Sequence, residues 1–258
     1  ANIKLGEETA ALGDLNQDGC DDFIVGAEED SYIERREGSA RIVWGWGGSG
    51  CPSQPSYTAL GIGVKDAEFG RSVGGNADLN NDGIPDVAIG STDYRGTALT
   101  EGGVWLLDGS LLSTLNAMPL VDLEFPKASE TVYHNIVDLL MAPPIVSPSE
   151  EERFGQQIQL FEGENGGYLA IAAPLANYGT GSLTGGVQIH PFDMIDNELE
   201  RNPTILITGA GLDNRSEFGS RLQIMMTNET PTLLIGAPLS DQAGPDVGAF
   251  MPIFLNQS

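Results

Sequence analysis

A nine-residue acidic pattern occurs twice in this chain, 64 residues apart, and it restricts the possible folds more than any other feature. The two copies are Asp14–Asp22 and Asp78–Asp86. Each carries oxygen-bearing side chains at positions 1, 3, 5 and 9, with glycine at position 6, where a tight turn can bring those side chains together. Calcium takes six to eight oxygen ligands at flexible angles, so such a loop with one backbone carbonyl nearly completes its shell. The pattern therefore predicts a metal-binding turn.

Two Ca²⁺ sites are expected, each with four side-chain ligands and the carbonyl of position 7. The predicted ligands are Asp14, Asn16, Asp18, Cys20 and Asp22 in the first loop, and Asp78, Asn80, Asp82, Ile84 and Asp86 in the second. The EF-hand shares the first six positions but needs a bidentate Glu at position 12 and a helix on each side. Position 12 is Val25 or Ile89 here, within β-branched runs that predict strands. Each loop is therefore expected at the tip of a β-hairpin.

Four repeats can be aligned on an aromatic residue or leucine followed by glycine. These anchors are Leu5-Gly6, Phe69-Gly70, Phe154-Gly155 and Phe218-Gly219. After each anchor come a strand ending in small residues, a third strand behind a glycine-rich turn, and a more variable fourth strand, for example around 204–207. Four-stranded antiparallel sheets repeated at this period predict an all-β fold, a β-propeller whose neighbouring blades cover both faces of each sheet. The predicted repeats within this single region, 1–258, are 1–64, 65–110 with an insertion at 111–152, 153–213 and 214–258.

The insertion and the tryptophans have competing interpretations. A short helix is expected over Ser129–Leu140, and the prolines that follow should end regular structure. The insertion is either a loop at a blade edge or a partner-binding feature. Trp44 and Trp105 lie in third strands, at positions we take as equivalent, and are expected to pack in the core or between blades rather than to form a sugar-binding platform.

Composition excludes several classes of protein. The chain has 12 basic and 37 acidic residues, a formal charge of −25, which disfavours nucleic-acid binding. It has no run of 18 apolar residues to span a membrane, and no basic start followed by an apolar stretch, so any signal peptide is expected to have been removed. Cys20 and Cys51 are either bonded to each other or two separate buried residues.

No catalytic set can be assembled from the sequence, so we predict that the protein is not an enzyme. Gly70–Gly74 matches a nucleophile-elbow string, but a hairpin is expected next instead of a helix, and only His134 and His190 could serve as a base. Gly45–Gly50 matches a phosphate-binding string, yet the Cys-Pro pair that follows cannot open a helix there.

The segments Phe69–Val73, Asp78–Gly90 and Gly103–Trp105 resemble the FG-GAP repeat, the blade unit of integrin α-subunit propellers. Four such repeats cover essentially the whole chain, and the first two match best. The resemblance implies an extracellular or cell-surface calcium-binding propeller that serves in cell adhesion or protein interaction, with calcium in a structural role. It also implies seven blades, whereas this chain has room for about four. The chain is thus expected to be part of a larger ring, or to pair with other chains at open blade edges.

Two departures and two alternatives accompany this interpretation. Glu162–Gly167 and Thr227–Pro231 occupy the loop position in the third and fourth repeats without the ligand spacing, so no metal is expected there. The alternatives are a non-catalytic propeller domain of a secreted hydrolase and a structural component of a large extracellular assembly. Sequence outside residues 1–258 would discriminate, because a catalytic domain favours the former and a stalk or transmembrane segment favours adhesion.

Overall fold

The computed structural model describes residues 3–95, 102–121, 131–142, 144–146, 153–163, 166–178, 183–193, 198–199, 205–209, 212, 215–227, 230–241 and 247–255. Regular structure in these residues is almost entirely β-strand. The exceptions are the one-turn helix α1 (Gly109–Leu112) and the 3₁₀ turn η2 (Val137–Leu139). No helix in this part of the chain is long and apolar enough to cross a membrane.

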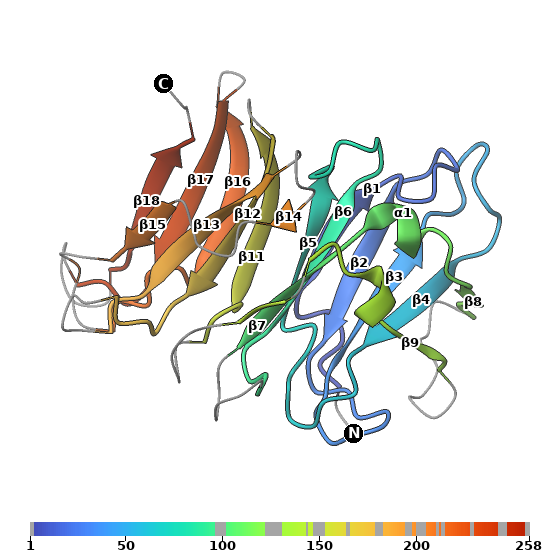
Figure 1. Ribbon diagram of the computed structural model, residues 1–258, viewed down its shortest axis with the longest axis horizontal. Coiled ribbons are helices and arrows are strands. Elements are labelled where there is room, and N and C mark those ends of the chain that lie inside the picture. Colours follow the sequence, from blue (N-terminus) through green and yellow to red (C-terminus); the bar gives the residue numbers. More distant parts are fainter. Residues whose placement is uncertain are drawn as a thin grey trace.

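The strands form four sheets, coloured from blue to red along the chain in Figure 1. The first sheet has the order β1 (Thr9–Gly13), β2 (Asp22–Ala27), β3 (Ser39–Trp44), β4 (Ser56–Gly61) and β8 (Met118–Pro119), with β9 (Tyr133–Asn135) also paired to β4. The second has the order β10 (Ile145–Val146), β7 (Gly103–Leu107), β6 (Asp86–Ser91) and β5 (Ser72–Ala77). In the third, β11 (Gln157–Gly163), β12 (Gly166–Ala173) and β13 (Gly186–Asp193) are consecutive, and β14 (Glu198–Leu199) and β15 (Ile205–Thr208) both pair with β13. The fourth consists of β16 (Arg221–Thr227), β17 (Thr230–Ala237) and β18 (Ala249–Phe254).

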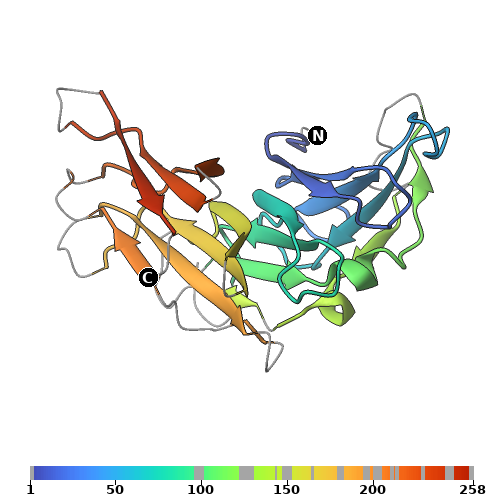
Figure 2. The same ribbon diagram turned by 90° about the horizontal axis from the view of Figure 1, so that it is seen from above.

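The four sheets follow one another around an arc that is open on one side (Figure 2). Neighbouring strands are antiparallel apart from β4 and β9, and the first strands β1, β5 and β11 of successive sheets lie against each other. The predicted all-β fold of propeller-like blades is confirmed. The sheets do not all have the expected four strands, however: the described residues form six, four, five and three strands in turn.

Three apolar clusters fill the spaces between successive sheets and explain why the array holds together. The first contains Ile42 and Trp44 of β3 together with Trp105 and Leu107 of β7, all at most 5% exposed. Packing of both tryptophans in the core is thus confirmed. Their assumed equivalence is wrong, because the pairing of each third strand with its neighbour aligns Trp105 with Arg41 instead of Trp44.

A repeated glycine brings each third strand into contact with the next anchor. Gly38, Gly102 and Gly185 precede β3, β7 and β13, and all three have positive φ angles, of 78°, 68° and 84°. A Cβ atom on them would lie only 2.1, 2.4 and 2.2 Å from the carbonyl oxygens of Phe69, Phe154 and Phe218 respectively. Glycine is therefore required at these positions by both the backbone conformation and the close approach of the next sheet.

The insertion supplies edge strands, so its interpretation as a blade-edge feature agrees with the structure. Met118 and Tyr133, in β8 and β9, extend the first sheet beyond β4, and β10 completes the second sheet. The helix expected over Ser129–Leu140 is wrong where the structure describes this stretch. A strand at Tyr133–Asn135 and a single 3₁₀ turn replace it, because pairing with β4 satisfies backbone groups that a helix would have paired internally. Residues 129–130 lie outside the described residues.

Candidate metal sites

Both acidic loops lie at hairpin tips, as predicted. The first joins β1 to β2 and the second joins β5 to β6. The fourth residue of each loop, Gln17 or Asn81, has a left-handed φ of 58°, and the following glycines, Gly19 and Gly83, have φ of 89° and 88°. The two loops therefore share one backbone conformation, in which glycine at position 6 avoids the cost that a side chain would carry.

The hydrogen bonds inside the two loops are the same, position by position. In the first, the Asp18 amide donates to Asp14 Oδ1 (2.9 Å) and to Asn16 Oδ1 (3.1 Å), and the Gly19 amide donates to Asp14 Oδ2 (2.8 Å). The corresponding distances in the second loop, from the Asp82 and Gly83 amides to Asp78 and Asn80, are 3.1, 3.0 and 2.8 Å. The oxygens of positions 1 and 3 therefore converge on one nitrogen in both loops.

Position 7 is also held the same way in both loops. The amides of Cys20 and Ile84 donate to Oδ1 of Asp18 and Asp82, over 3.0 and 2.9 Å. These bonds fix the predicted carbonyl-bearing residues next to the carboxylate of position 5.

The ninth residues of the loops, Asp22 and Asp86, are buried, and other carboxylates lie near each of them. Each accepts one amide from its own loop, Leu15 or Leu79, at 2.9 and 2.8 Å. Burial raises the pKa of Asp22 to about 6 and that of Asp86 to about 7, although these backbone hydrogen bonds work in the opposite direction. Ionising such a carboxyl at neutral pH is costly unless positive charge lies nearby, and a cation would supply that charge.

Two glycines that the motifs did not predict hold the ninth residues in place. Gly45 and Gly109 are 64 residues apart, and their amides donate to Asp22 Oδ1 (2.7 Å) and Asp86 Oδ1 (3.1 Å). A Cβ on Gly109 would lie 1.9 Å from the Pro85 oxygen, so only glycine allows this approach. Their spacing, equal to that of the loops, is the sequence signal that could have found them.

The donor set of each loop, three carboxylates and one amide oxygen, has the chemistry that calcium prefers. In the described residues, no three Asp, Glu, His or Cys side chains converge closely enough to form a preassembled metal cluster. The loop carboxylates instead accept amide hydrogen bonds, and each oxygen keeps lone-pair capacity beyond them. The residues present thus fit the ion by chemistry and by the convergence of positions 1 and 3.

The third and fourth repeats end in tight hairpins at the corresponding place. Gly163 pairs with Gly166, and Thr227 pairs with Thr230. The two residues at each tip, 164–165 and 228–229, lie outside the described residues. The expectation that no metal binds there stays a prediction.

The other sequence motifs have structural roles in this fold. Cys20 and Cys51 form a disulfide with a Cα–Cα distance of 5.8 Å. The Ser72 hydroxyl is buried and donates to the Gly155 carbonyl at 2.6 Å, and His190 is buried beside Gln188, 3.1 Å away. Gly45–Gly50 forms a loop.

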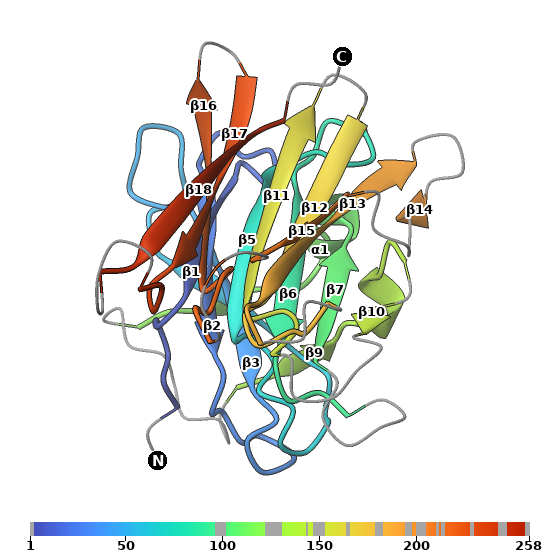
Figure 3. The same ribbon diagram turned by 90° about the vertical axis from the view of Figure 1, so that its left-hand side faces the viewer.

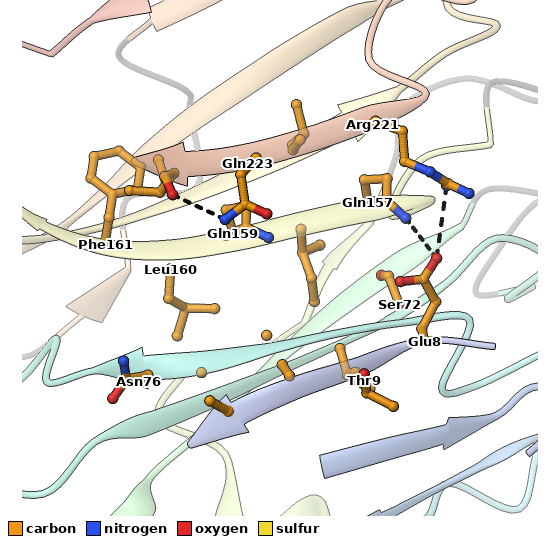
Figure 4. Close-up of a pocket in the computed structure, with 18 of the residues that line it drawn as sticks. Glu8, Thr9, Ser72, Asn76, Gln157, Gln159, Leu160, Phe161, Arg221 and Gln223 are labelled. Carbon is orange, nitrogen blue, oxygen red and sulfur yellow. Dashed lines mark hydrogen bonds and ion pairs between the residues drawn. The ribbon is translucent and has the colours of Figure 1, made fainter. Parts of the chain in front are cut away.

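A polar hollow of about 830 Å³ lies along the first strands of all four sheets (Figure 4). Glu8, next to β1, reaches across it: its Oε1 accepts a hydrogen bond from Gln157 in the third sheet (3.0 Å) and lies 3.8 Å from Arg221 Nη1 in the fourth. Gln159, Gln223, Asn76 and Ser72 also line this hollow. These polar side chains can form hydrogen bonds with water that fills the hollow.

Comparison with known proteins finds integrin alpha chains among the relatives of this sequence. Over 84 residues, 31% of this chain and 8% of the relative, the sequence is 39% identical to mouse integrin alpha-3. It is 32% identical to mouse integrin alpha-E over 124 residues, 46% of the chain and 10% of the relative. It is 39% identical to human integrin alpha-6 over 109 residues, 42% of the chain and 9% of the relative. No family model matches the chain.

The fold and the matches together support an integrin α-like FG-GAP propeller relationship, which confirms the resemblance drawn from the motifs. The aligned segments span a tenth or less of these three relatives.

Proposed function

We propose that this protein is an extracellular or cell-surface calcium-binding interaction module without enzymatic activity, in which calcium has a structural role. The observation that carries the proposal is the pair of acidic hairpin tips with matching conformations and hydrogen bonds. Bound calcium would offset the charge of three carboxylates in each loop. Because the loops connect the first two strands of the first two sheets, metal would stabilise hairpins whose first strands, β1 and β5, lie against each other.

Replacing Asp82 with alanine tests the structural role of calcium. With free calcium about 100-fold above Kd, loss of one site should remove about 2.7 kcal/mol of unfolding free energy. In chelator the same variant should lose only about 1 kcal/mol or less, because its side chain is exposed and caps only a local turn. Thermal or urea unfolding with calcium and with chelator measures both values.

Asp21→Ala is the matched control, since Asp21 is an exposed aspartate inside the first loop but at position 8, where no ligand is expected. It removes the same charge as Asp18→Ala, three residues away. Asp18→Ala should reproduce the calcium-specific loss and Asp21→Ala should not. An equal loss for Asp82→Ala with and without calcium would contradict the proposed role.

The interaction surface that we propose is the uncovered face of the last sheet, in which β18 is drawn in front of β16 and β17 in Figure 3. Equivalent positions of the third strands β3, β7 and β13 are occupied by Ala40, Val104 and Val187. Each of these residues is at most 1% exposed, because the next sheet covers it. The corresponding residue of β18, by its pairing with β17, is Phe250, which is 73% exposed. Phe254, on the same face, is 61% exposed.

The edge of this sheet is open as well. Third strands β3, β7 and β13 each pair with a further strand, whereas in the described residues β18 pairs only with β17. An apolar face beside an unpaired edge attracts a further β-sheet, and the three covered faces show how one packs. We infer that a further β-sheet, from another blade of the same ring or from another chain, occupies this face.

The double variant Phe250→Asp/Phe254→Asp tests this surface. When no further sheet covers it, the apolar face should cause weak self-association at high concentration and high salt, where the charge of −25 is screened. Sedimentation velocity should show this for the unmodified chain but not for the double variant. Ile33→Asp, at an exposed apolar residue in the β2–β3 connection, should behave like the unmodified chain. A monomer at every concentration, or an equal effect of Ile33→Asp, would count against this surface.

A further inference from the structure

The side chain at position 7 of the two acidic loops is anchored by different chemistry, although the hydrogen bonds inside the loops match. In the first loop this residue is Cys20, bonded to Cys51. In the second it is Ile84, which packs against the apolar cluster between the first two sheets. Each anchor joins the loop to the segment that follows the third strand of its own sheet.

The second loop is held without a covalent bond. Ile84 Cγ2 would lie 3.0 Å from a Cβ on Gly109, at the start of α1, so the loop and the helix are in direct contact. Asp108 caps α1 by accepting the amides of Ser110 and Leu111, and Pro85 at position 8 restricts the loop backbone. Asp78, the first loop residue, also donates its amide to Glu162 of the third sheet at 3.0 Å.

The first loop has a different support. Position 8 is Asp21 instead of proline, and residues 46–50, which follow Gly45, are all exposed. Two hydrogen bonds hold that segment together, Gly47 amide to Pro52 carbonyl (2.9 Å) and Cys51 amide to Gly48 carbonyl (3.2 Å), and the Trp46 ring lies 6.4 Å from the Phe23 ring of β2. The disulfide is thus the main link between this segment and position 7, and Cys20 is only 6% exposed beneath it.

From this contrast we infer that the Cys20–Cys51 bond is a positioning element for calcium in the first loop, and in that loop alone. The inference rests on the proposed function, since it requires calcium to bind both loops. The bond fixes position 7, so binding need not order it; without the bond, ordering that residue weakens binding. The second loop has its apolar and proline anchors and is independent of this bond.

The experiment isolates each loop before breaking the bond. Asp82→Ala leaves the first loop as the only predicted site, and Asp18→Ala leaves the second. Calcium affinity is measured by calorimetry in both backgrounds, with and without Cys20→Ser/Cys51→Ser. Loss of the cysteines should weaken calcium binding about tenfold in the Asp82→Ala background, the effect of ordering about one residue. In the Asp18→Ala background it should change by less than about twofold.

Each outcome has a separate meaning. Equal affinities with and without the cysteines in the Asp82→Ala background would overturn the inference while leaving calcium binding intact. Absence of calcium binding in both backgrounds with the disulfide intact would overturn the proposed function itself. Calcium binding by the second loop of the cysteine-free protein shows that the variant is folded. Reduction by a phosphine and water, which yields two thiols and the phosphine oxide, should reproduce the loss in the first loop.

Discussion

Gly38→Ala is expected to destabilise the protein by more than about 4 kcal/mol, the range reserved for severe steric or packing defects. A Cβ there would lie 2.1 Å from the Phe69 oxygen and 2.3 Å from the Phe69 nitrogen, and both of these are backbone atoms that cannot rotate away. Relieving the clash would separate the first two sheets, which are joined at this point by the Phe69 amide donating to the Glu37 carbonyl (2.9 Å). Urea unfolding monitored by circular dichroism measures the loss.

Gly248→Ala is the matched control for this prediction. Gly248 precedes β18 as Gly38 precedes β3, and its φ of 73° is nearly the same. The nearest atom to an added Cβ is the Pro238 oxygen at 3.1 Å, because no anchor packs against Gly248 in the described residues. Only the positive-φ strain remains, about 1–2 kcal/mol. Similar losses for both variants would show that contact between sheets does not require the glycine.

Arg41→Met should cost about 3–5 kcal/mol, because it leaves a buried carboxylate without its cation. Arg41 and Asp30 are both fully buried, with Arg41 Nη2 3.0 Å from Asp30 Oδ2. The same oxygen accepts the hydroxyls of Ser39 (2.8 Å) and Tyr133 (2.6 Å). Burial, and then the Asp30 carboxylate, raise the pKa of Tyr133, so this hydroxyl stays a donor at neutral pH. The cluster joins the insertion to the first sheet.

Arg35→Met and a double variant complete this test by chemical unfolding. Arg35 is 70% exposed and pairs with Asp66 at 2.8 Å, and such surface pairs contribute about 1 kcal/mol or less. Adding Asp30→Asn to Arg41→Met removes the unpaired charge and should recover part of the lost stability. If Arg41→Met is no more harmful than Arg35→Met, the buried pair has no special structural role.

The repeated motifs made most of the blade architecture predictable. The predicted third strands appear as β3, β7, β13 and β18. The strands predicted after the acidic loops appear as β2 and β6, and the fourth strand predicted near 204–207 appears as β15. These predictions rely on local patterns, such as β-branched runs between glycines, which identify strands without long-range information.

Long-range pairing explains what the sequence did not reveal. The insertion pairs with β4, more than 70 residues earlier in the chain, so its local helical pattern was misleading. Trp105 occupies the position of Arg41 and not that of Trp44, because strand register sets the alignment and residue type does not reveal it. The bond between Cys20 and Cys51 depends on how two loops meet in space, which their spacing leaves open.

The calcium ligands were predicted from local sequence alone, and the structure shows which other residues hold them in place. Gly45 and Gly109 approach the ninth loop residues only once the third strand of each sheet lies beside its loop. An alignment at the 64-residue spacing would have identified both glycines, although not the hydrogen bonds that they make.

The most direct measurement counts the calcium ions bound by each chain. Calorimetric titration at millimolar calcium, a range suited to extracellular sites, should give two ions per chain, one ion for Asp18→Ala or Asp82→Ala, and none for the double variant. Absence of binding to the unmodified chain, or two ions still bound by the double variant, would contradict the assignment of calcium to the hairpin tips.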